Sequence, residues 1–366
     1  MAEYYIGVMS GTSADGIDAI LAKIGKDEFS ITDFVSISMP SKVRSEILSL
    51  IQDDFDALNR AYRLSSQLSS LYAEVVNTLI ARNSVVVRAV GCHGQTLRHF
   101  PHQNPPYTIQ IVNGALLAQL TKTTTVVDFR SADLAAGGEG APLAPGFHSA
   151  LFHSSCEDRG VLNLGGIANI TYIPKNQTQN ILGFDTGPAS ALLDIWIAEH
   201  HNESFDNDGT WAKTGCINTD LLDTFLSDFY FNSPPPKSTG RESFNKEWLH
   251  HKLVRFPDLK PEDIQATLVE LTAKTISDSI NSYLPTIQRL ITSGGGSRNS
   301  YLIERIERLI NPIELETSDI YKIGVNQVEA AAFAWLTYRR MNNLTGNIPT
   351  VTGATRECIL GAIYEA

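Results

Sequence analysis

The sequence predicts a two-domain α/β protein, and three observations lead to this prediction. The chain has 366 residues, which exceeds the size at which a single hydrophobic core usually stops growing. Short apolar runs typical of strands alternate with amphipathic patterns typical of helices. The same order of elements also begins again after a polar break at 154–159. We therefore expect domains 1–155 and 156–366, with a cleft between them.

The first half is predicted to be a sheet with helices on its faces. Apolar segments at 5–9 and 17–24 flank a polar turn, which indicates a β-hairpin with a long tip. A third strand at 29–39 ends at Pro40, because proline disrupts strand and helix interiors. The further predicted elements are helices at 43–51 and 58–80, strands at 85–90, 107–112 and 123–127, and a helix that ends at 152.

The second half repeats this pattern of elements, although not the residues, which indicates an architectural duplication. Three strands are predicted first, and a helix follows them. The predicted elements are strands at 161–163, 167–173 and 181–184, a helix at 191–200, a long amphipathic helix at 261–283, a strand at 287–291, and helices at 300–309 and 328–341.

Composition narrows the class of protein. Hydrophobic residues make up 43% and charged residues 19% of the chain, as in ordinary globular proteins. The net charge of −11 and the lack of Lys/Arg runs disfavour a nucleic-acid binder. The four cysteines are widely spaced, so we expect buried thiols in a reducing compartment. No signal-peptide pattern or membrane-spanning stretch is present, which favours a cytoplasmic location.

Three glycine-rich turns, at 10–16, 183–188 and 293–296, each follow a predicted strand. Backbone N–H groups at such turns bind phosphate. Three such turns, together with Asp15 and Asp18 at the first and Asp185 in the second, indicate nucleotide-dependent phosphoryl transfer. In the first turn, Asp15 and Asp18 are candidates for holding Mg²⁺ through water. The alternative is a polar hairpin tip with an Asx turn.

The other two turns suggest a base and a nucleotide contact. Asp185 lies where a strand ends, a common place for catalytic groups, and its carboxylate can accept a proton. The alternative is an aspartate that caps the next helix. Bare backbone at Gly294, Gly295 and Gly296 suits a planar adenine, with Asn299 near its polar edge, but an ordinary strand-to-helix turn also fits.

Polar residues after other strands are candidate sugar contacts. Gln95 and Thr96 can bind hydroxyl groups, while Asp128 and Arg130 offer a carboxylate and a guanidinium for a substrate acid. Glu329 is either a ligand carboxylate or a first-turn residue favoured by the helix dipole. His93 and His99 are more typical of structural histidines. P-loop, Rossmann, protein-kinase, serine-hydrolase and zinc-protease motifs are all missing.

Eight motifs, in the same order, resemble the anhydro-N-acetylmuramic acid kinase family. They are MSGTSADGID (9–18), GCHGQTLRH (91–99), RSADLAAGGEGAPLAPGFH (130–148), NLGGIANIT (163–171), GFDTGPAS (183–190), DGTWAKTG (208–215), PPKSTGRESF (235–244) and SGGGSRN (293–299).

This resemblance implies a duplicated, ribonuclease H-like fold of the sugar kinase, Hsp70 and actin superfamily, with ATP and Mg²⁺ in a central cleft and a homodimer as the assembly. It implies that water opens the 1,6-anhydro bridge of the sugar while O6 is phosphorylated, in cell-wall sugar recycling. By motif, the general base falls on Asp185. The implied sugar contacts are Thr12, Asp15, Gln95, Thr96, Asp128, Arg130 and Glu329. The predicted ATP contacts are Gly11, Thr12, Ser13, Ala14, Asp15, Gly16, Ile17, Asp18, Gly165, Gly166, Gly187, Gly294, Gly295, Gly296 and Asn299, with Asp18 also the predicted metal residue.

One departure from the family pattern is Ala189-Ser190, where Gly-Asn is common. An amide contact to the phosphates or the sugar is then lost, or replaced by the Ser190 hydroxyl. Two alternatives stay open. One is a kinase for another anhydrosugar, such as levoglucosan. The other is an ATP-binding scaffold that transfers no phosphate.

Overall fold

The computed structural model describes residues 2–11, 13–52, 55–176 and 178–366, and these form two compact units. The first unit is the chain up to Leu151 together with Gln327–Ala366, and the second is Phe152–Asn326. The predicted second domain, 156–366, therefore differs from the second unit mainly because it includes residues 327–366. Gln327–Ala366 belongs with the first unit because its helix α12 (Val328–Met341) packs on the first unit's sheet.

The first unit is built on a six-stranded sheet with the order β13-β7-β4-β1-β2-β3. Strands β1, β2 and β3 form an antiparallel meander, β4 and β7 continue parallel to β1, and β13 is antiparallel to β7. The strands are β1 (Glu3–Met9), β2 (Gly16–Ile24), β3 (Phe29–Ser38), β4 (Val87–Cys92), β7 (Thr125–Val127) and β13 (Ala362–Tyr364).

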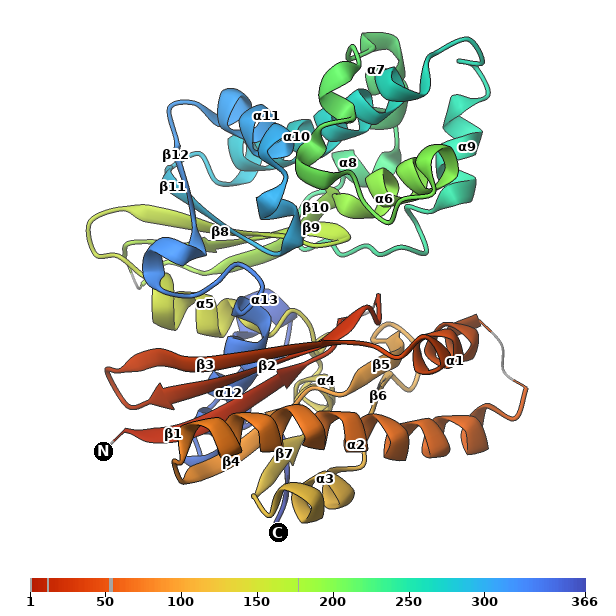
Figure 1. Cartoon of the computed structure of the whole chain (residues 1–366). Coiled ribbons are helices and arrows are strands. Elements are labelled where there is room, and N and C mark those ends of the chain that lie inside the picture. The colour runs from red at the N-terminus through yellow and green to blue at the C-terminus, as the bar shows by residue number, and fades with distance from the viewer. Residues whose placement is uncertain (1, 12, 53–54, 177) are drawn as a thin grey trace. The chain divides into compact units, whose positions relative to one another are not determined.

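Helices cover both faces of this sheet. Leu64, Leu68 and Tyr72 of α2 (Ala57–Asn83) pack in one core with Ile6 and other strand residues, while α12 lies on the opposite face (Figure 1). The remaining elements are α1 (Ser41–Gln52), the hairpin β5 (Gln95–Phe100) and β6 (Tyr107–Ile111), α3 (Gly114–Thr121), α4 (Ser131–Ala135), α5 (Ala144–Phe152) and α13 (Pro349–Thr352).

Glycines in the strands allow α12 to lie unusually close to the sheet. A Cβ atom on Gly7 would collide with the backbone of Ala330 and Ala334, and one on Gly91 would collide with Thr337. The alanine-rich sequence of α12 matches this short separation, since small side chains let backbones approach. The helix is thereby fixed firmly, and it carries Glu329 in its first turn.

The second unit repeats the topology of the first. Its sheet has the order β10-β9-β8-β11-β12, in which β8, β9 and β10 form an antiparallel meander and β11 and β12 follow parallel to β8. This matches β3-β2-β1-β4-β7 strand for strand, so the predicted duplication is confirmed in topology. The strands are β8 (Asp158–Leu164), β9 (Ile167–Ile173), β10 (Leu182–Pro188), β11 (Ile287–Ser293) and β12 (Glu314–Thr317).

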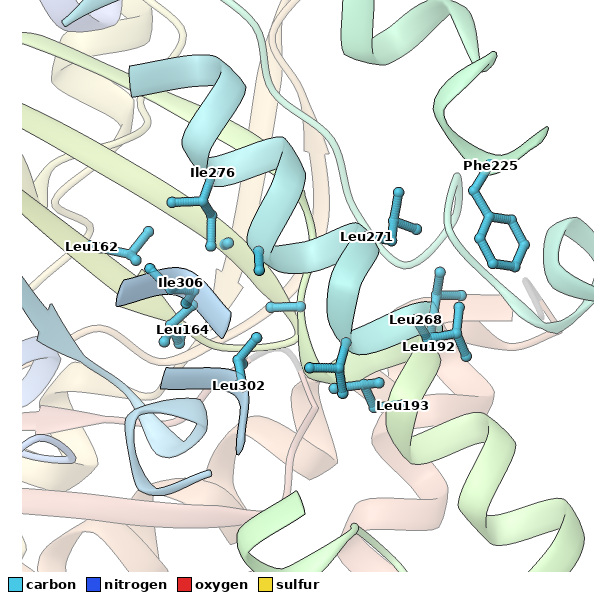
Figure 2. Close-up of a cluster of buried hydrophobic side chains, with 14 of the residues drawn as sticks. Leu162, Leu164, Leu192, Leu193, Phe225, Leu268, Leu271, Ile276, Leu302 and Ile306 are labelled. Atoms are coloured by element: carbon cyan, nitrogen blue, oxygen red, sulfur yellow. The ribbon is translucent and has the colours of Figure 1, made fainter. Parts of the chain in front are cut away.

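One face of the second sheet carries the hydrophobic core of this unit (Figure 2). Leu162 and Leu164 of β8 pack there with side chains from α10 (Pro261–Tyr283), such as Ile276, and from α11 (Ser300–Ile310). The other helices are α6 (Ser190–His201), η1 (Asn207–Gly209), η2 (Ala212–Thr214), α7 (Thr219–Leu226), α8 (Phe229–Asn232), α9 (Lys246–Leu253), η3 (Gly295–Arg298) and η4 (Ser318–Tyr321).

The predicted strand at 107–112 has a different setting from the one expected. β6 does not join the main sheet but pairs with β5 in a separate two-stranded hairpin. None of the helices that the structure describes combines the length and apolar character that a membrane crossing requires.

Candidate active site

In the first unit, the side chain of Gln95 forms hydrogen bonds with the start of the predicted phosphate turn. The Ser10 hydroxyl donates to Gln95 Oε1 at 2.8 Å, and Gln95 Nε2 donates to the Gly11 carbonyl at 3.1 Å. Gln95 is completely buried, so in this structure its amide supports the turn. Further along the turn, Asp15 is exposed and pairs with Arg44 at 2.7 Å. Thr12, predicted to contact both ligands, lies outside the described residues.

The charge of Asp18 acts on a second carboxyl group of the first unit, that of Glu329. Asp18 is half-buried on β2, and Glu329 is exposed at the start of α12. Desolvation raises the pKa of Asp18, and it also raises the pKa of Glu329, with the Asp18 charge adding to the second shift and Arg130 opposing it. Neighbouring carboxylates that repel each other can be stabilised by a cation or a shared proton.

This pair fits the chemistry of Mg²⁺, which uses one or two carboxylates together with water and substrate phosphates. Within the described part of the chain, no three acidic, histidine or cysteine side chains are grouped to hold a metal by themselves. A Mg²⁺ ion held by Asp18 would therefore depend on the nucleotide for its other ligands.

Arg130 is engaged within the first unit. Its Nε and Nη2 donate to His93 Nε2 at 3.0 and 2.9 Å, and its Nη1 donates to the Gly140 carbonyl at 2.8 Å. Burial, and then the Arg130 charge, hold the pKa of His93 well below its usual value. His93 is therefore neutral and structural, as its sequence setting indicates.

The other predicted sugar contacts of the first unit lie near strand ends. Asp128 is exposed directly after β7, with a positive φ of 55°, and its Oδ1 accepts from the Ser131 hydroxyl at 2.6 Å. Thr96 is half-buried on β5 and accepts from Gln110 Nε2 at 3.3 Å. Asp128 therefore orders the start of α4, next to Arg130.

Asp133, a completely buried carboxylate, is not among the predicted site residues. It accepts from the Gly140 amide at 2.8 Å, Asn347 Nδ2 at 2.6 Å and the Thr352 hydroxyl at 2.7 Å. These bonds join two segments more than 200 residues apart, and they fix Gly140, whose carbonyl binds Arg130. The available sequence signal was a carboxylate followed by a glycine-rich stretch at 137–140.

In the second unit, a row of polar residues crosses four strands. Asp185 pairs with Asn169, Asn169 with Asn163, and Asn163 with Ser293. Directly opposed residues of neighbouring strands point to the same face, and the alternate residues Leu162, Leu164, Ala168, Ile170 and Phe184 lie in the core. The row therefore lies on the face opposite the core.

Asp185 is half-buried, and one of its oxygens is well held. Its Oδ2 accepts from the Ser238 hydroxyl at 3.0 Å and the Thr239 amide at 2.9 Å. Desolvation, helped by Glu242, raises the pKa of Asp185 to about 6, although Thr239, Ser238 and Lys237 act in the opposite direction. A carboxyl with such a pKa is suited to proton transfer near neutral pH.

The glycine turn at 294–296 lies beside this row. A Cβ on Gly294 would lie 2.6 Å from Asn163 Oδ1, and one on Gly296 would lie 2.8 Å from Leu164 Cβ, whereas a Cβ on Gly295 would meet nothing within 4 Å. The Gly294 turn therefore packs against the end of β8 and leaves Gly295 open.

Other predicted nucleotide contacts lie at the start of helix α6 and form hydrogen bonds there. The Gly165 and Gly166 carbonyls accept from the first amides of α6, including Ser190 N at 3.0 Å and Ala189 N at 2.9 Å. Ala189 has a φ of −117°, so this position does not require the left-handed conformation that favours glycine. Gly187, with a φ of 152°, packs under Phe231.

Asn299 Oδ1 caps α11 through Leu302 N at 3.0 Å, and Asp208 Oδ1 binds Ser300 N at the same distance. Motifs 208–215 and 293–299, distant in sequence, thus meet at the start of α11.

The four residues that hold Asp185, namely Tyr230, Lys237, Ser238 and Thr239, were not among the predicted site residues. The only sequence signal was their position in or before the motif at 235–244. The contact partners lie 53 and 54 residues from Asp185, so no local pattern indicates the contact.

The duplicated sheet order defines the class: an α/β protein built from two units whose five central strands have the same order and directions. The family model described as anhydro-N-acetylmuramic acid kinase matches residues 3–366. The chain therefore belongs to the anhydro-N-acetylmuramic acid kinase family.

Curated relatives of that name cover almost the whole chain. The relative from Nitrosomonas europaea is 44% identical over 99% of this chain and 100% of its own length. That from Pseudomonas savastanoi pv. phaseolicola is 45% identical over 99% of both chains. Among solved structures, the activator of the 2-hydroxyisocaproyl-CoA dehydratase from Clostridium difficile is similar with a TM-score of 0.46 and 15% identity, over 93% of this chain and 96% of that one.

Proposed function

We propose that the protein uses ATP to convert 1,6-anhydro-N-acetylmuramic acid into N-acetylmuramic acid 6-phosphate and ADP. The observation that carries the mechanism is Asp185, a half-buried carboxyl whose pKa is raised to about 6 and whose Oδ2 alone is occupied by donors. Family membership supports the substrate and the reaction.

Asp185 acts as the general base in this reaction. It accepts a proton from the water whose oxygen bonds to C1 of the sugar, while the bond between C1 and O6 breaks. O6 then bonds to the γ-phosphorus of ATP, and the bond from that phosphorus to the leaving oxygen of ADP breaks. Asp185 later releases its proton to solvent, so atoms and charge balance.

The other candidate residues bind and orient. The first turn, from Gly11 to Asp18, contacts the phosphates, and Asp18 is the residue that holds Mg²⁺, which would neutralise phosphate charge. Gly165, Gly166 and the open backbone at Gly295 contact the nucleotide. Glu329 and Asp128, both exposed, bind sugar hydroxyls. Arg130 stabilises the sugar site through His93 and Gly140.

The test is a reaction in ¹⁸O-labelled water with ATP, Mg²⁺ and either the muramic anhydrosugar or levoglucosan. We expect a sugar 6-phosphate with ¹⁸O at C1 from the muramic compound, detected by mass spectrometry. Phosphorylation of levoglucosan alone would instead identify a kinase for another anhydrosugar. ADP without any sugar phosphate would contradict the kinase assignment.

The setting of this reaction is also part of the proposal. The proposed substrates, a cell-wall sugar and ATP, favour a cytoplasmic enzyme of peptidoglycan recycling. A homodimer is the assembly proposed for the family, and size-exclusion chromatography with light scattering measures it directly.

A further inference from the structure

A single short segment, 230–239, makes four hydrogen bonds to Asp185. The Tyr230 hydroxyl donates to the Asp185 carbonyl at 2.7 Å, and the Asp185 amide donates to the Lys237 carbonyl at 3.1 Å. The Ser238 hydroxyl and the Thr239 amide both donate to Oδ2, at 3.0 and 2.9 Å. Backbone and side chain of Asp185 are thus both fixed.

Lys237, near the end of the segment, contacts Tyr230 at its start. Its Nζ donates to the Tyr230 carbonyl at 3.3 Å and lies 4.8 Å from the centre of the Tyr230 ring. A cation at this distance from an aromatic ring is attracted to its face. The two ends of the segment therefore support each other, and the donors to Asp185 are held in place before any ligand binds.

The two carboxylate oxygens of Asp185 have different surroundings. Oδ2 has two donors, whereas Oδ1 accepts no hydrogen bond from any residue that the structure describes. Donors occupy the lone pairs of the oxygen that they bind and leave the other oxygen as the better proton acceptor.

Resting on the proposed function, we infer that Ser238 and Thr239 are positioning residues, which hold Oδ2 and thereby select Oδ1 as the oxygen that takes the proton from water. Neither residue touches the reacting atoms in this role. Segment 230–239 thus sets the orientation of the Asp185 carboxylate and influences its ionisation.

The charges around Asp185 agree with this role. Desolvation and the Glu242 carboxylate raise the pKa of Asp185, while the Thr239 amide, the Ser238 hydroxyl and the Lys237 ammonium lower it. Tyr230, also in contact, has its own pKa raised by burial and by the Asp185 charge, so it stays a neutral donor. Removal of the Ser238 hydroxyl should therefore raise the Asp185 pKa further.

The experiment compares Ser238→Ala with Ser238→Thr, which keeps a hydroxyl. Ser233→Ala is the matched control, because that hydroxyl donates to the Phe229 carbonyl and makes no bond to Asp185. Ser238 is exposed, so its truncation leaves the core intact. Two quantities are measured: the pH profile of kcat, and the carboxyl titration of Asp185 by ¹³C NMR in aspartate-labelled protein, assigned with Asp185→Asn.

For Ser238→Ala we expect both the acidic limb of kcat and the NMR titration to move up by about half a pH unit, since one hydrogen bond to the charged form is lost. This corresponds to an approximately threefold loss of kcat on the acidic limb and little change on the plateau. Ser238→Thr and Ser233→Ala should titrate like the unmodified protein.

An unchanged Asp185 titration in Ser238→Ala overturns the inference. The NMR measurement needs no turnover, so it decides this point even if the protein fails to phosphorylate either sugar. Loss of the proposed function and loss of the positioning role therefore give different results.

Discussion

Asp185 of β10 and Asn169 of β9 are direct partners in an antiparallel ladder, on the sheet face opposite the hydrophobic core. The side chains of Asn169 and its neighbour in the row, Asn163, are half-buried and form no hydrogen bond to a described residue. Two amides beside a candidate base offer donors for phosphate or sugar oxygens. Substitution of Asp185 should therefore lower turnover, whereas substitution of Asn163 or Asn169 should weaken ligand binding.

Replacement of Asp185 by Asn should abolish the base while preserving most contacts. The amide oxygen can still accept from Ser238 and Thr239, so we expect ATP affinity to change little and turnover to fall by about 10²-fold or more. Calorimetry with a non-hydrolysable ATP analogue and steady-state kinetics measure the two effects. Asp258→Asn, at an exposed position, is the control. Turnover close to that of the unmodified protein would remove Asp185 from the base role.

The raised pKa of Asp185 has opposite consequences for activity and stability. Because the base works when ionised, activity should rise with pH through about 6. A carboxyl whose pKa is higher in the folded state stabilises the fold while protonated, and this contribution is lost as pH rises from the unfolded value of 3.8 through about 6.

Asp185→Asn stays neutral, so it should melt a few degrees above the unmodified protein at pH 8. This gain should shrink to almost nothing near pH 3, below the unfolded value of 3.8, where Asp185 is mostly protonated in both states. Differential scanning calorimetry at both pH values checks the sign, and an equal gain at both would contradict it.

Gly295→Ala should weaken ATP binding without a loss of stability. Its added Cβ meets no atom within 4 Å, so the melting temperature should not change. If the adenine packs on this backbone, the KM for ATP should rise by about tenfold, because each 1.4 kcal/mol of lost contact is a factor of ten. Gly296→Ala is the contrast, since its Cβ would lie 2.8 Å from Leu164 Cβ and should lower the melting temperature.

Asp133→Ala should destabilise the first unit by about 2–4 kcal/mol, because it leaves the Gly140 amide, Asn347 and Thr352 without their acceptor in a buried place. Urea unfolding followed by fluorescence measures this change. Asp27→Ala, on an exposed turn, should alter stability by less than about 0.5 kcal/mol. Equal stability of the two variants would show that the Asp133 network contributes little.

The sequence predicts the elements with a strong internal period most closely. It predicts helices at 261–283 and 328–341, and α10 and α12 have those bounds. The short strands β5, β12 and β13 are not predicted. The packing of Gln327–Ala366 with the first unit is also beyond local pattern, since it depends on contacts between distant segments.

The candidate site also contains residues that the local sequence indicates and residues that it does not. Asp185 can be proposed from a strand, a glycine turn and the chemistry of a carboxylate, all of which are local. Its partners Ser238 and Thr239 cannot, because the loop that carries them is brought to β10 by folding. Arg130 is a further case: its charge suggests the ligand contact that stays a prediction, whereas its bonds to His93 and Gly140, 37 and 10 residues away, are set by the fold.

The return of α12 to the sheet of the first unit has a consequence for biosynthesis. The second unit is continuous, Phe152–Asn326, whereas the first needs residues on both sides of it. A ribosome adds residues from the N-terminus, and domains fold as units when their sequence is available. The second unit can therefore form its core before α12 has been synthesised and can pack on β1 and β4. The helix that carries Glu329 is synthesised after the whole of the second unit, so the nascent chain gains this candidate sugar contact only once Phe152–Asn326 has been translated.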